Sequence, residues 1–356
     1  MDFGLFIPPV ADSWKVVMRA EELGFSRAWF YDTQLLNSEL FVSMAAAAMH
    51  TSRIRLATGV MIPSNRIAPV AASGLATLNA LAPGRIDFGI STGFTARRTL
   101  GVGPVKLADM EEYIRVVRGL LARETMEWAF EGQPRKARLI DPDMGAFNLV
   151  DPIPLHISAF GPKGRRLVAR LKAGWLGSVP NVEFGRGLIA DMQAAWCEAG
   201  HDPAELHASA TISGCVLREG EAYDSPRVKA ITGPNATVAL HSMVEADQFG
   251  DTFRTRRLPP ELAPLAERYR EIYSGYQPED ARYLSNHRGH LMYLRPEEDE
   301  LCTGELIRAT TWTAPKEALR ERLRGLKEAG CSHIGINAGY GHPERLEDWA
   351  EVFEGV

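Results

Sequence analysis

Cysteine is scarce in this sequence, and its few occurrences lie far apart. The 356 residues contain four cysteines, at positions 197, 215, 302 and 331, and no two of them form a C-x-x-C pair. This spacing matches no structural zinc site, and a chain of this length needs no disulfide framework. Scattered thiols in such a chain indicate a protein of the reducing cytoplasm.

Long apolar runs and basic clusters are also absent. The alanine-rich run Leu40–Met49 is too short to cross a membrane, and Met1–Pro8 lacks the charged start of a signal peptide. The formal net charge is -5, so neither a membrane nor a nucleic acid is an expected partner. With 45% hydrophobic and 24% charged residues, the composition is that of an ordinary globular protein.

Several catalytic signatures are missing. The chain has no H-E-x-x-H, no G-x-S-x-G, no Walker loop and no Rossmann glycine fingerprint, so a catalytic metal and a serine nucleophile are not supported. His287 and His290 are three residues apart and could share one side of a helical turn as ligands or acid/base groups. A structural role for both histidines is the more common alternative.

Strand-like and helix-like segments alternate along the chain. Apolar, β-rich runs occupy residues 3–7, 27–31, 54–60, 85–90, 155–158, 175–179, 208–217 and 333–337, with helical segments between them. Such alternation predicts parallel strands joined by crossover helices. A doubly wound sheet also fits the first half, but the alternation continues to the C-terminus. It therefore favours a (β/α)8 TIM barrel with insertions, forming a single domain over residues 1–356.

Two stretches interrupt the alternation. Thr125–Asp151 is rich in proline, glycine and charge, and we expect it to form a hairpin excursion. Residues 220–312, before the last helix–strand unit, form the largest insertion and contain helical patches such as Leu262–Tyr276. A segment of this length is too long for a bare loop, so it should contain helices and shape the substrate pocket.

In a (β/α)8 barrel, functional residues follow the C-terminal ends of the strands. Ala159–Gly164 joins the fifth strand to a helix, where backbone N–H groups and Lys163 could hold a phosphate. A plain turn with a solvated lysine explains the same residues equally well. Ser91–Leu100, which contains Thr92, Gly93 and two arginines, offers a second anion-binding loop or a solvated basic turn.

Two further strand ends are candidates. Asp32 closes the second strand, where a carboxylate can act as acid or base or bind a polar group of a ligand. A capping role at the next turn is the more common alternative. Gly59 lies at the end of the third strand, and a glycine there indicates either a close approach by a planar ligand or a bend of the barrel.

Three segments together resemble the bacterial-luciferase-like superfamily. They are residues 58–93 with Thr58-Gly-Val, Pro83-Gly-Arg and Gly89-Ile-Ser-Thr-Gly, residues 154–177 with Ala159-Phe-Gly-Pro-Lys, and residues 313–330 with Thr313-Ala-Pro-Lys-Glu. The second segment resembles the cofactor-phosphate loop of the deazaflavin branch, typified by methylene-tetrahydromethanopterin reductases. Here the chain departs from many relatives after the second strand, where Asp32-Thr33 replaces an acidic residue followed by histidine.

The resemblance implies a dimeric barrel that binds coenzyme F420 or FMN across its C-terminal mouth. The cofactor ring would pack on a non-proline cis peptide at Gly59–Val60, with Thr58 beside it. The phosphate would lie near Ala159, Gly161, Pro162 and Lys163, with Thr92 and Gly93 close by. In this family Asp32 corresponds to the acidic residue beside the ring, which makes it the expected catalytic residue.

These features predict an oxidoreductase acting on a small organic substrate. F420-dependent hydride transfer is favoured by the Gly-Pro-Lys loop, and the protein would supply binding and orientation to the cofactor. The main alternative is a monooxygenase that uses reduced FMN from a separate flavin reductase. A barrel that binds flavin without turnover is a second alternative. An unrelated phosphate-binding lyase or isomerase would need a Schiff-base lysine or a metal cluster, and the strand ends offer neither.

Overall fold

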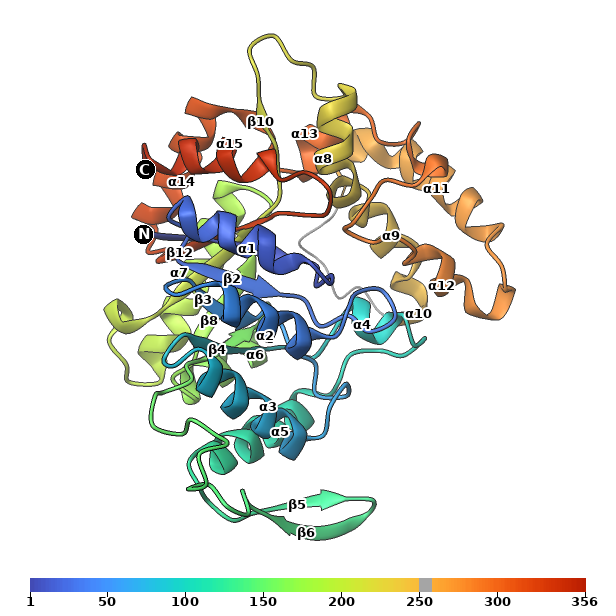
Figure 1. The fold of residues 1–356 in the computed structure, drawn as a ribbon. Helices are drawn as coiled ribbons and strands as arrows, with labels where there is room; N and C mark the ends of the chain where they lie inside the picture. Colours follow the sequence, from blue (N-terminus) through green and yellow to red (C-terminus); the bar gives the residue numbers. More distant parts are fainter. Residues whose placement is uncertain (250–257) are drawn as a thin grey trace.

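The computed structural model describes residues 1–249 and 258–356, and its centre is a closed barrel of parallel strands (Figure 1). The barrel strands are β1 (Asp2–Ile7), β2 (Arg27–Phe30), β3 (Arg55–Thr58), β4 (Ile86–Ile90), β7 (Leu155–Ser158), β8 (Gly174–Ser178), β9 (Ala208–Ile212) and β12 (His333–Asn337). The last strand closes the ring, because β12 pairs with both β9 and β1. The predicted (β/α)8 barrel is therefore confirmed.

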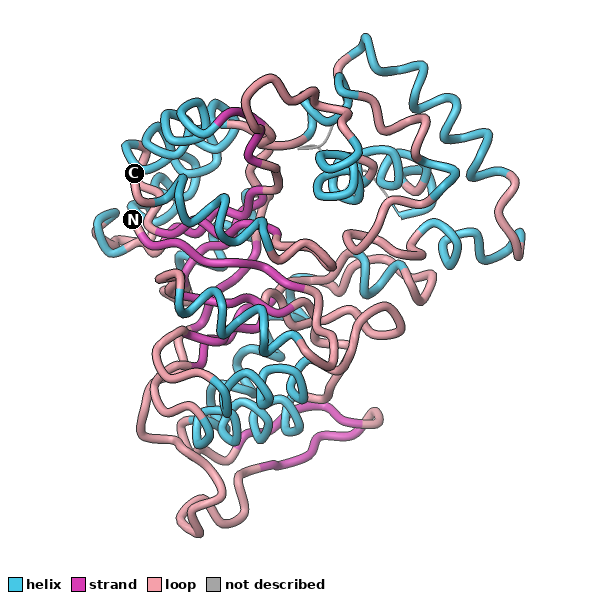
Figure 2. Tube along the Cα trace, turned by 45° about the horizontal axis from the view of Figure 1, so that its top comes forward, coloured by secondary structure: helices cyan, strands magenta, loops and turns pink. Residues whose placement is uncertain are grey.

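Helices cover the outside of the barrel, as the tube view shows (Figure 2). They are α1 (Ser13–Glu22), α2 (Leu40–His50), α3 (Ala68–Leu81), α5 (Leu107–Leu121), α6 (Pro162–Arg170), α7 (Val182–Glu198), α14 (Lys316–Glu328) and α15 (Glu344–Phe353). The short helix α4 (Thr95–Arg98) lies instead in the loop after β4, beyond the ends of the strands (Figure 1). Strands β2, β4 and β12 are buried at every residue. Burial on both faces explains why these strands appear in the sequence as nearly continuous apolar runs.

Two predicted boundaries are wrong. The strand expected over 208–217 ends at Ile212, and β10 (Val216–Leu217) pairs outside the barrel with β11 (Ala314–Pro315). Gly214 lies between them against the 312–313 backbone, where an added Cβ would be 2.7 Å from the Trp312 carbonyl carbon. Helix α6 begins at Pro162, before the expected Gly164, because proline fits the first turn of a helix.

The excursion expected over Thr125–Asp151 contains an antiparallel hairpin. Its strands are β5 (Met126–Phe130) and β6 (Gln133–Ala137). In Figure 1 the hairpin projects from the bottom of the molecule, beyond α3 and α5. This position separates it from the large insertion.

The large insertion is helical, as expected. Its helices are α8 (Pro226–Ala236), α9 (Val238–Val244), α10 (Ala246–Phe249), α11 (Ala263–Ser274), α12 (Arg282–Asn286) and α13 (Gly304–Thr310). They pack around an apolar core of their own, which includes Val228, Leu240, Tyr269 and Leu306. Figure 1 shows them gathered on one side of the barrel. Residues 250–257 of the insertion lie outside the described residues.

Polar side chains fill the end of the barrel at which the strands begin. Asp87 on β4 is fully buried and accepts hydrogen bonds from Arg27 Nε (2.8 Å), Arg55 Nε (2.9 Å) and Arg55 Nη2 (2.8 Å). Three histidine rings, His156, His207 and His333, lie beside this carboxylate. Burial lowers the pKa of His207 to about 4, so that ring is neutral at neutral pH. Polar packing at this end of a barrel supports stability.

Candidate active site

A cavity of about 440 Å³ opens at the opposite end of the barrel, where the strands end. Every barrel strand, or the residue just after it, contributes to the lining. The contributing residues are Phe6, Tyr31, Gly59, Ser91, Ser158, Ser178, Thr211 and Asn337. Cavities of about 300–1,000 Å³ at this face are typical of small-molecule sites in (β/α)8 barrels.

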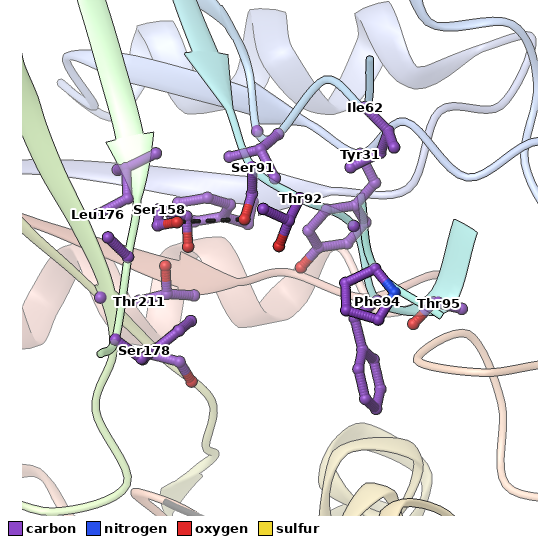
Figure 3. Close-up of a pocket in the computed structure, with 18 of the residues that line it drawn as sticks. Tyr31, Ile62, Ser91, Thr92, Phe94, Thr95, Ser158, Leu176, Ser178 and Thr211 are labelled. Carbon is purple, nitrogen blue, oxygen red and sulfur yellow. Dashed lines mark hydrogen bonds between the residues drawn. The ribbon is translucent and has the colours of Figure 1, made fainter. Parts of the chain in front are cut away.

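The lining is uncharged and combines hydroxyl groups with a larger share of apolar and aromatic side chains. Hydroxyl groups of Ser91, Thr92, Ser158, Ser178 and Thr211 gather around it (Figure 3). The Ser91 hydroxyl donates to the carbonyl oxygen of Ser158 (3.1 Å), which joins the ends of β4 and β7. No described lysine, arginine, aspartate or glutamate lines the cavity. Hydroxyl and backbone groups set among aromatic rings suit a planar heterocycle with several polar edge atoms.

The loop after β3 brings its backbone to the cavity wall. Gly59 and Val60 line the cavity, and the peptide bond between them is cis, as the family resemblance implies. An added Cβ on Gly59 would lie 2.5 Å from Trp29 Cβ, so no side chain fits there. Thr58 points away, because its buried hydroxyl exchanges hydrogen bonds with the backbone of Gly89. The structure thus places Gly59 and Val60 in the site and Thr58 in the supporting wall.

The loop after β4 supplies Thr92 and Gly93, and both line the cavity. Gly93 has φ +87, and an added Cβ would lie 2.6 Å from Arg97 Cγ, so glycine is required there. The two arginines of this loop are engaged inside the protein. Arg97 Nε donates to the carbonyl oxygen of Gly103 (2.9 Å), and the buried Arg98 pairs with Glu245 of the insertion (2.8 Å).

The loop after β7 supplies Ala159 and Gly161, and Gly161 caps the N-terminus of α6. No side chain caps this helix, and its first turn contains no acidic residue. Its first N–H groups therefore suit an anion. Pro162 and Lys163 are exposed and do not line the cavity. The structure thus brings Ala159 and Gly161 together with the other predicted residues around the cavity. Pro162 and Lys163 lie outside the lining, at the edge of the cavity.

Asp32 lies at the end of β2 and lines a smaller neighbouring cavity of about 140 Å³. Its carboxylate is buried and accepts the N–H of Ile62 (3.0 Å) and Arg66 Nη1 (2.8 and 2.9 Å). Arg66 in turn bonds to Glu39. Because both oxygens are engaged, this arrangement fixes the loops after β2 and β3. A catalytic role for Asp32 stays a prediction.

The sequence predicts that the insertion shapes the pocket but does not assign Val238 or Leu291 to its lining. Val238, His290 and Leu291 line the main cavity, and His290 and Leu291 also line the smaller one. The spacing of His287 and His290 was the available signal, and the centroids of the two rings lie 5.2 Å apart in the turn that follows the end of α12 at Asn286. Among the described residues, no cluster of histidine, cysteine, aspartate or glutamate could hold a metal ion. No described helix is long and apolar enough to cross a membrane.

Comparison with curated proteins gives partial alignments. The chain is 29% identical over 218 residues to 5,10-methylenetetrahydromethanopterin reductase of Methanolobus tindarius, covering 59% of this chain and 64% of that protein. It is 34% identical over 140 residues to F420-dependent glucose-6-phosphate dehydrogenase of Beutenbergia cavernae, covering 37% of this chain and 40% of that protein. The chain therefore spans less than two thirds of either relative.

Solved structures share the whole fold. An F420-dependent secondary alcohol dehydrogenase in complex with an F420–acetone adduct has a TM-score of 0.71 at 18% identity, covering 100% of this chain and 98% of that one. The oxygenating constituent of 3,6-diketocamphane monooxygenase of Pseudomonas putida, in complex with FMN, has a TM-score of 0.61 at 13% identity, covering 99% and 95%. The model of the family described as luciferase-like monooxygenase matches residues 5–333. The chain therefore belongs to the luciferase-like monooxygenase family.

Proposed function

We propose that this protein is an F420-dependent oxidoreductase that transfers a hydride to or from a small organic substrate. The observation that carries the proposal is the uncharged, hydroxyl-rich cavity at the ends of all eight strands, with an uncapped helix N-terminus at its edge. Two of the similar proteins are F420-dependent by name: the glucose-6-phosphate dehydrogenase of Beutenbergia cavernae and the secondary alcohol dehydrogenase of similar fold. The proposal covers carbonyl compounds, alcohols and related compounds and does not choose among them.

The residues present fit such a cofactor. Gly59 and Val60 give the ring a flat backbone surface, and an added Cβ on Gly161 would meet no atom within 4 Å, which leaves space at the helix N-terminus. Pro162 has no N–H, so the N–H groups of Lys163 and Gly164 in the first turn of α6 would hold the phosphate. The Lys163 side chain would add a positive charge nearby. Thr92 and Gly93 would contact the cofactor from the loop after β4.

The bound deazaflavin supplies a carbon that accepts or donates a hydride. The chain's own part is to hold the ring against Gly59 and Val60 and to orient the substrate above it. Val238 and Leu291 of the insertion line the cavity, and these apolar side chains would keep water away from their part of it. As a proposed acid/base group, Asp32 would act from the smaller cavity while held by Arg66.

A reduced-FMN monooxygenase is the second candidate. The observation that favours it is the fold shared with the FMN-bound monooxygenase component of Pseudomonas putida. The apolar side chains that the insertion adds to the cavity lining, Val238 and Leu291, would also suit oxygen chemistry, which requires a dry site. In that case a separate flavin reductase would supply the reduced cofactor.

Equilibrium titration of the purified protein with F420 and with FMN, each oxidised and reduced, tests the proposal. We expect F420 to bind in the micromolar range and FMN to bind more weakly, measured by fluorescence or absorbance. A preference for reduced FMN would favour the monooxygenase and call for an oxygen-consumption screen. Binding of neither cofactor would contradict both candidates and leave only the barrel established.

We also propose that the protein is a homodimer of the reducing cytoplasm, in which its cysteines stay unpaired. Helices α2 and α3 pack side by side and are apolar almost all round, with Val42 69% and Met49 67% exposed. Helices that are apolar on every face are normally buried, and a second copy of this face would bury them.

The double variant Val42→Glu, Met49→Glu is expected to be monomeric by light scattering at concentrations where the wild type is dimeric. Charges placed opposite their own copies repel across a symmetric interface. The control is Leu284→Glu, since Leu284 is 48% exposed on α12 of the insertion. A wild type that is monomeric, or a double variant that stays dimeric, would show that this face is not the interface.

A further inference from the structure

The insertion brings one histidine to the cavity wall. His290 is buried and lines both the main and the smaller cavity, next to Leu291. Leu291 has φ 62 and Gly289 has φ 68, so the turn that carries the ring holds a non-glycine residue in the left-handed region. Such backbone persists where the surrounding structure enforces it, and it often occurs at functional sites.

A buried series of polar side chains extends from this ring into the insertion. His290 Nδ1 lies 3.3 Å from Nδ1 of His241 on α9, and His241 Nε2 contacts the carboxylate of Glu298. Arg295 bonds to the same carboxylate and to the Tyr269 hydroxyl (2.7 Å). His241, Glu298 and Arg295 are all buried. These side chains therefore form a buried hydrogen-bonded network with a fixed geometry and are not separately solvated.

The carboxylate determines which ring nitrogens carry protons. His241 Nε2 lies 3.3 Å from Arg295 Nη2 and closer to Glu298. An ionised carboxylate only accepts, so the shorter contact assigns the Nε2–H of His241 as the donor to Glu298. Burial lowers the pKa of His241 and keeps its ring neutral, so its Nδ1 has a lone pair. His290 Nδ1–H therefore donates to His241 Nδ1, and Nε2 is the second ring nitrogen of His290, at which a proton can be exchanged.

Reduction of a carbonyl group by hydride transfer also requires one proton. When the hydride adds to the carbonyl carbon, the C=O π bond breaks and its electron pair moves to oxygen, which must be protonated to give the alcohol. Oxidation of the alcohol returns both the hydride and the proton. The described residues that line the main cavity include two titratable side chains, Tyr31 and His290. A histidine has its ordinary pKa near neutral pH, whereas that of tyrosine is about 10.

We propose that His290 is the catalytic acid/base, giving its Nε2 proton to the substrate oxygen during reduction and taking it back during oxidation. The proposal rests on the proposed hydride transfer. His241 and Glu298 are positioning residues that fix the His290 tautomer, and the Glu298 carboxylate stabilises the imidazolium through His241. The other described titratable groups that face His290 are His287, with ring centroids 5.2 Å apart, and Asp32 across the smaller cavity.

The tautomer is tested on the cofactor-free protein. Nitrogen-15 NMR of the histidine side chains is expected to show His241 protonated at Nε2 and neutral His290 protonated at Nδ1, with assignments from His241→Gln and His290→Gln. A neutral His290 protonated at Nε2, with Nδ1 bare, would overturn the relay. This measurement needs no substrate, so it decides the geometry even if no tested compound is turned over.

The chemical role is tested with F420, using 2-propanol and cyclohexanol as probe alcohols and the absorbance of F420 as the signal. His290→Gln is expected to bind F420 as the wild type does but to oxidise the alcohols about 10²–10⁴-fold more slowly, with the neutral-pH limb of the rate profile lost. The matched control is His287→Gln, since His287 is equally buried and pairs with Glu245 (2.9 Å) but does not line the main cavity.

The outcomes separate this inference from the proposed function. If His290→Gln keeps the wild-type rate and pH profile, His290 is not the acid/base, and Tyr31→Phe becomes the next variant. Equal losses in His290→Gln and His287→Gln would show a structural role and overturn the proposal. If F420 does not bind to the wild type, the proposed hydride transfer itself fails.

Discussion

Replacing Gly161 with aspartate is expected to weaken F420 and FMN binding about 100-fold while leaving the protein equally stable. Gly161 caps α6 with φ -91, a conformation open to any residue, and an added Cβ meets no atom within 4 Å. Aspartate is a favourable N-cap, because its carboxylate accepts the N–H groups of the first turn. Those groups are the proposed phosphate ligands, so the new charge both occupies them and repels the phosphate.

The size of the effect follows from the hydrogen bonds lost. Two bonds to a charged phosphate at about 1.5 kcal/mol each correspond to about 100-fold in Kd. Titration of Gly161→Asp by fluorescence measures it, with thermal unfolding as the check on the fold. Gly161→Ala should bind as the wild type does, and Gly161→Asn should lie between the two. Riboflavin, which lacks the phosphate, should bind wild type and Gly161→Asp alike; unchanged FMN binding would place the phosphate elsewhere.

The barrel was predictable because its signal is local and repeated. Each strand is a short apolar run ended by a polar or glycine residue, and eight such runs alternate with helices. The error over 208–217 has a different origin. Val216 and Leu217 are as apolar as the true strand, but Gly214 packs against the backbone at 312–313, almost a hundred residues later, and β10 leaves the barrel. A contact between segments so distant leaves no trace in the local pattern.

The residues that line the cavity were predictable to a similar extent, and the predictions that failed did so for similar reasons. Gly59, Thr92, Gly93 and Gly161 reach the cavity because strand ends in a barrel converge, which topology alone implies. Thr58 turned away because its hydroxyl satisfies the backbone of the neighbouring strand, a pairing that depends on strand register. The contribution of His290 could not be placed, since it depends on how an irregular helical insertion folds over the mouth.

Replacing Asp87 with asparagine is expected to destabilise the protein by about 3–5 kcal/mol, the range for breaking a buried ion pair. Asp87 is fully buried on β4, and its carboxylate is the partner of Arg27 (2.8 Å) and Arg55 (2.8 Å). Burial alone would raise the pKa of the Asp87 carboxyl, but His156, Arg55 and Arg27 together hold that pKa far below its usual range. The variant leaves the positive charges of Arg27 and Arg55 without a counter-charge at the buried end of the barrel.

The midpoint and slope of urea unfolding measure this loss, and the midpoint should fall while the slope stays unchanged. The control is Glu351→Gln, which breaks the exposed pair between Lys316 and Glu351 (2.6 Å) and should leave the unfolding midpoint nearly unchanged, because solvent screens the pair. Because Asp87 lies at the end of the barrel opposite the cavity, cofactor affinity of the folded variant should match the wild type. A loss below 1 kcal/mol in Asp87→Asn would show that Arg27 and Arg55 find compensation elsewhere, and that this network does not hold the strands together.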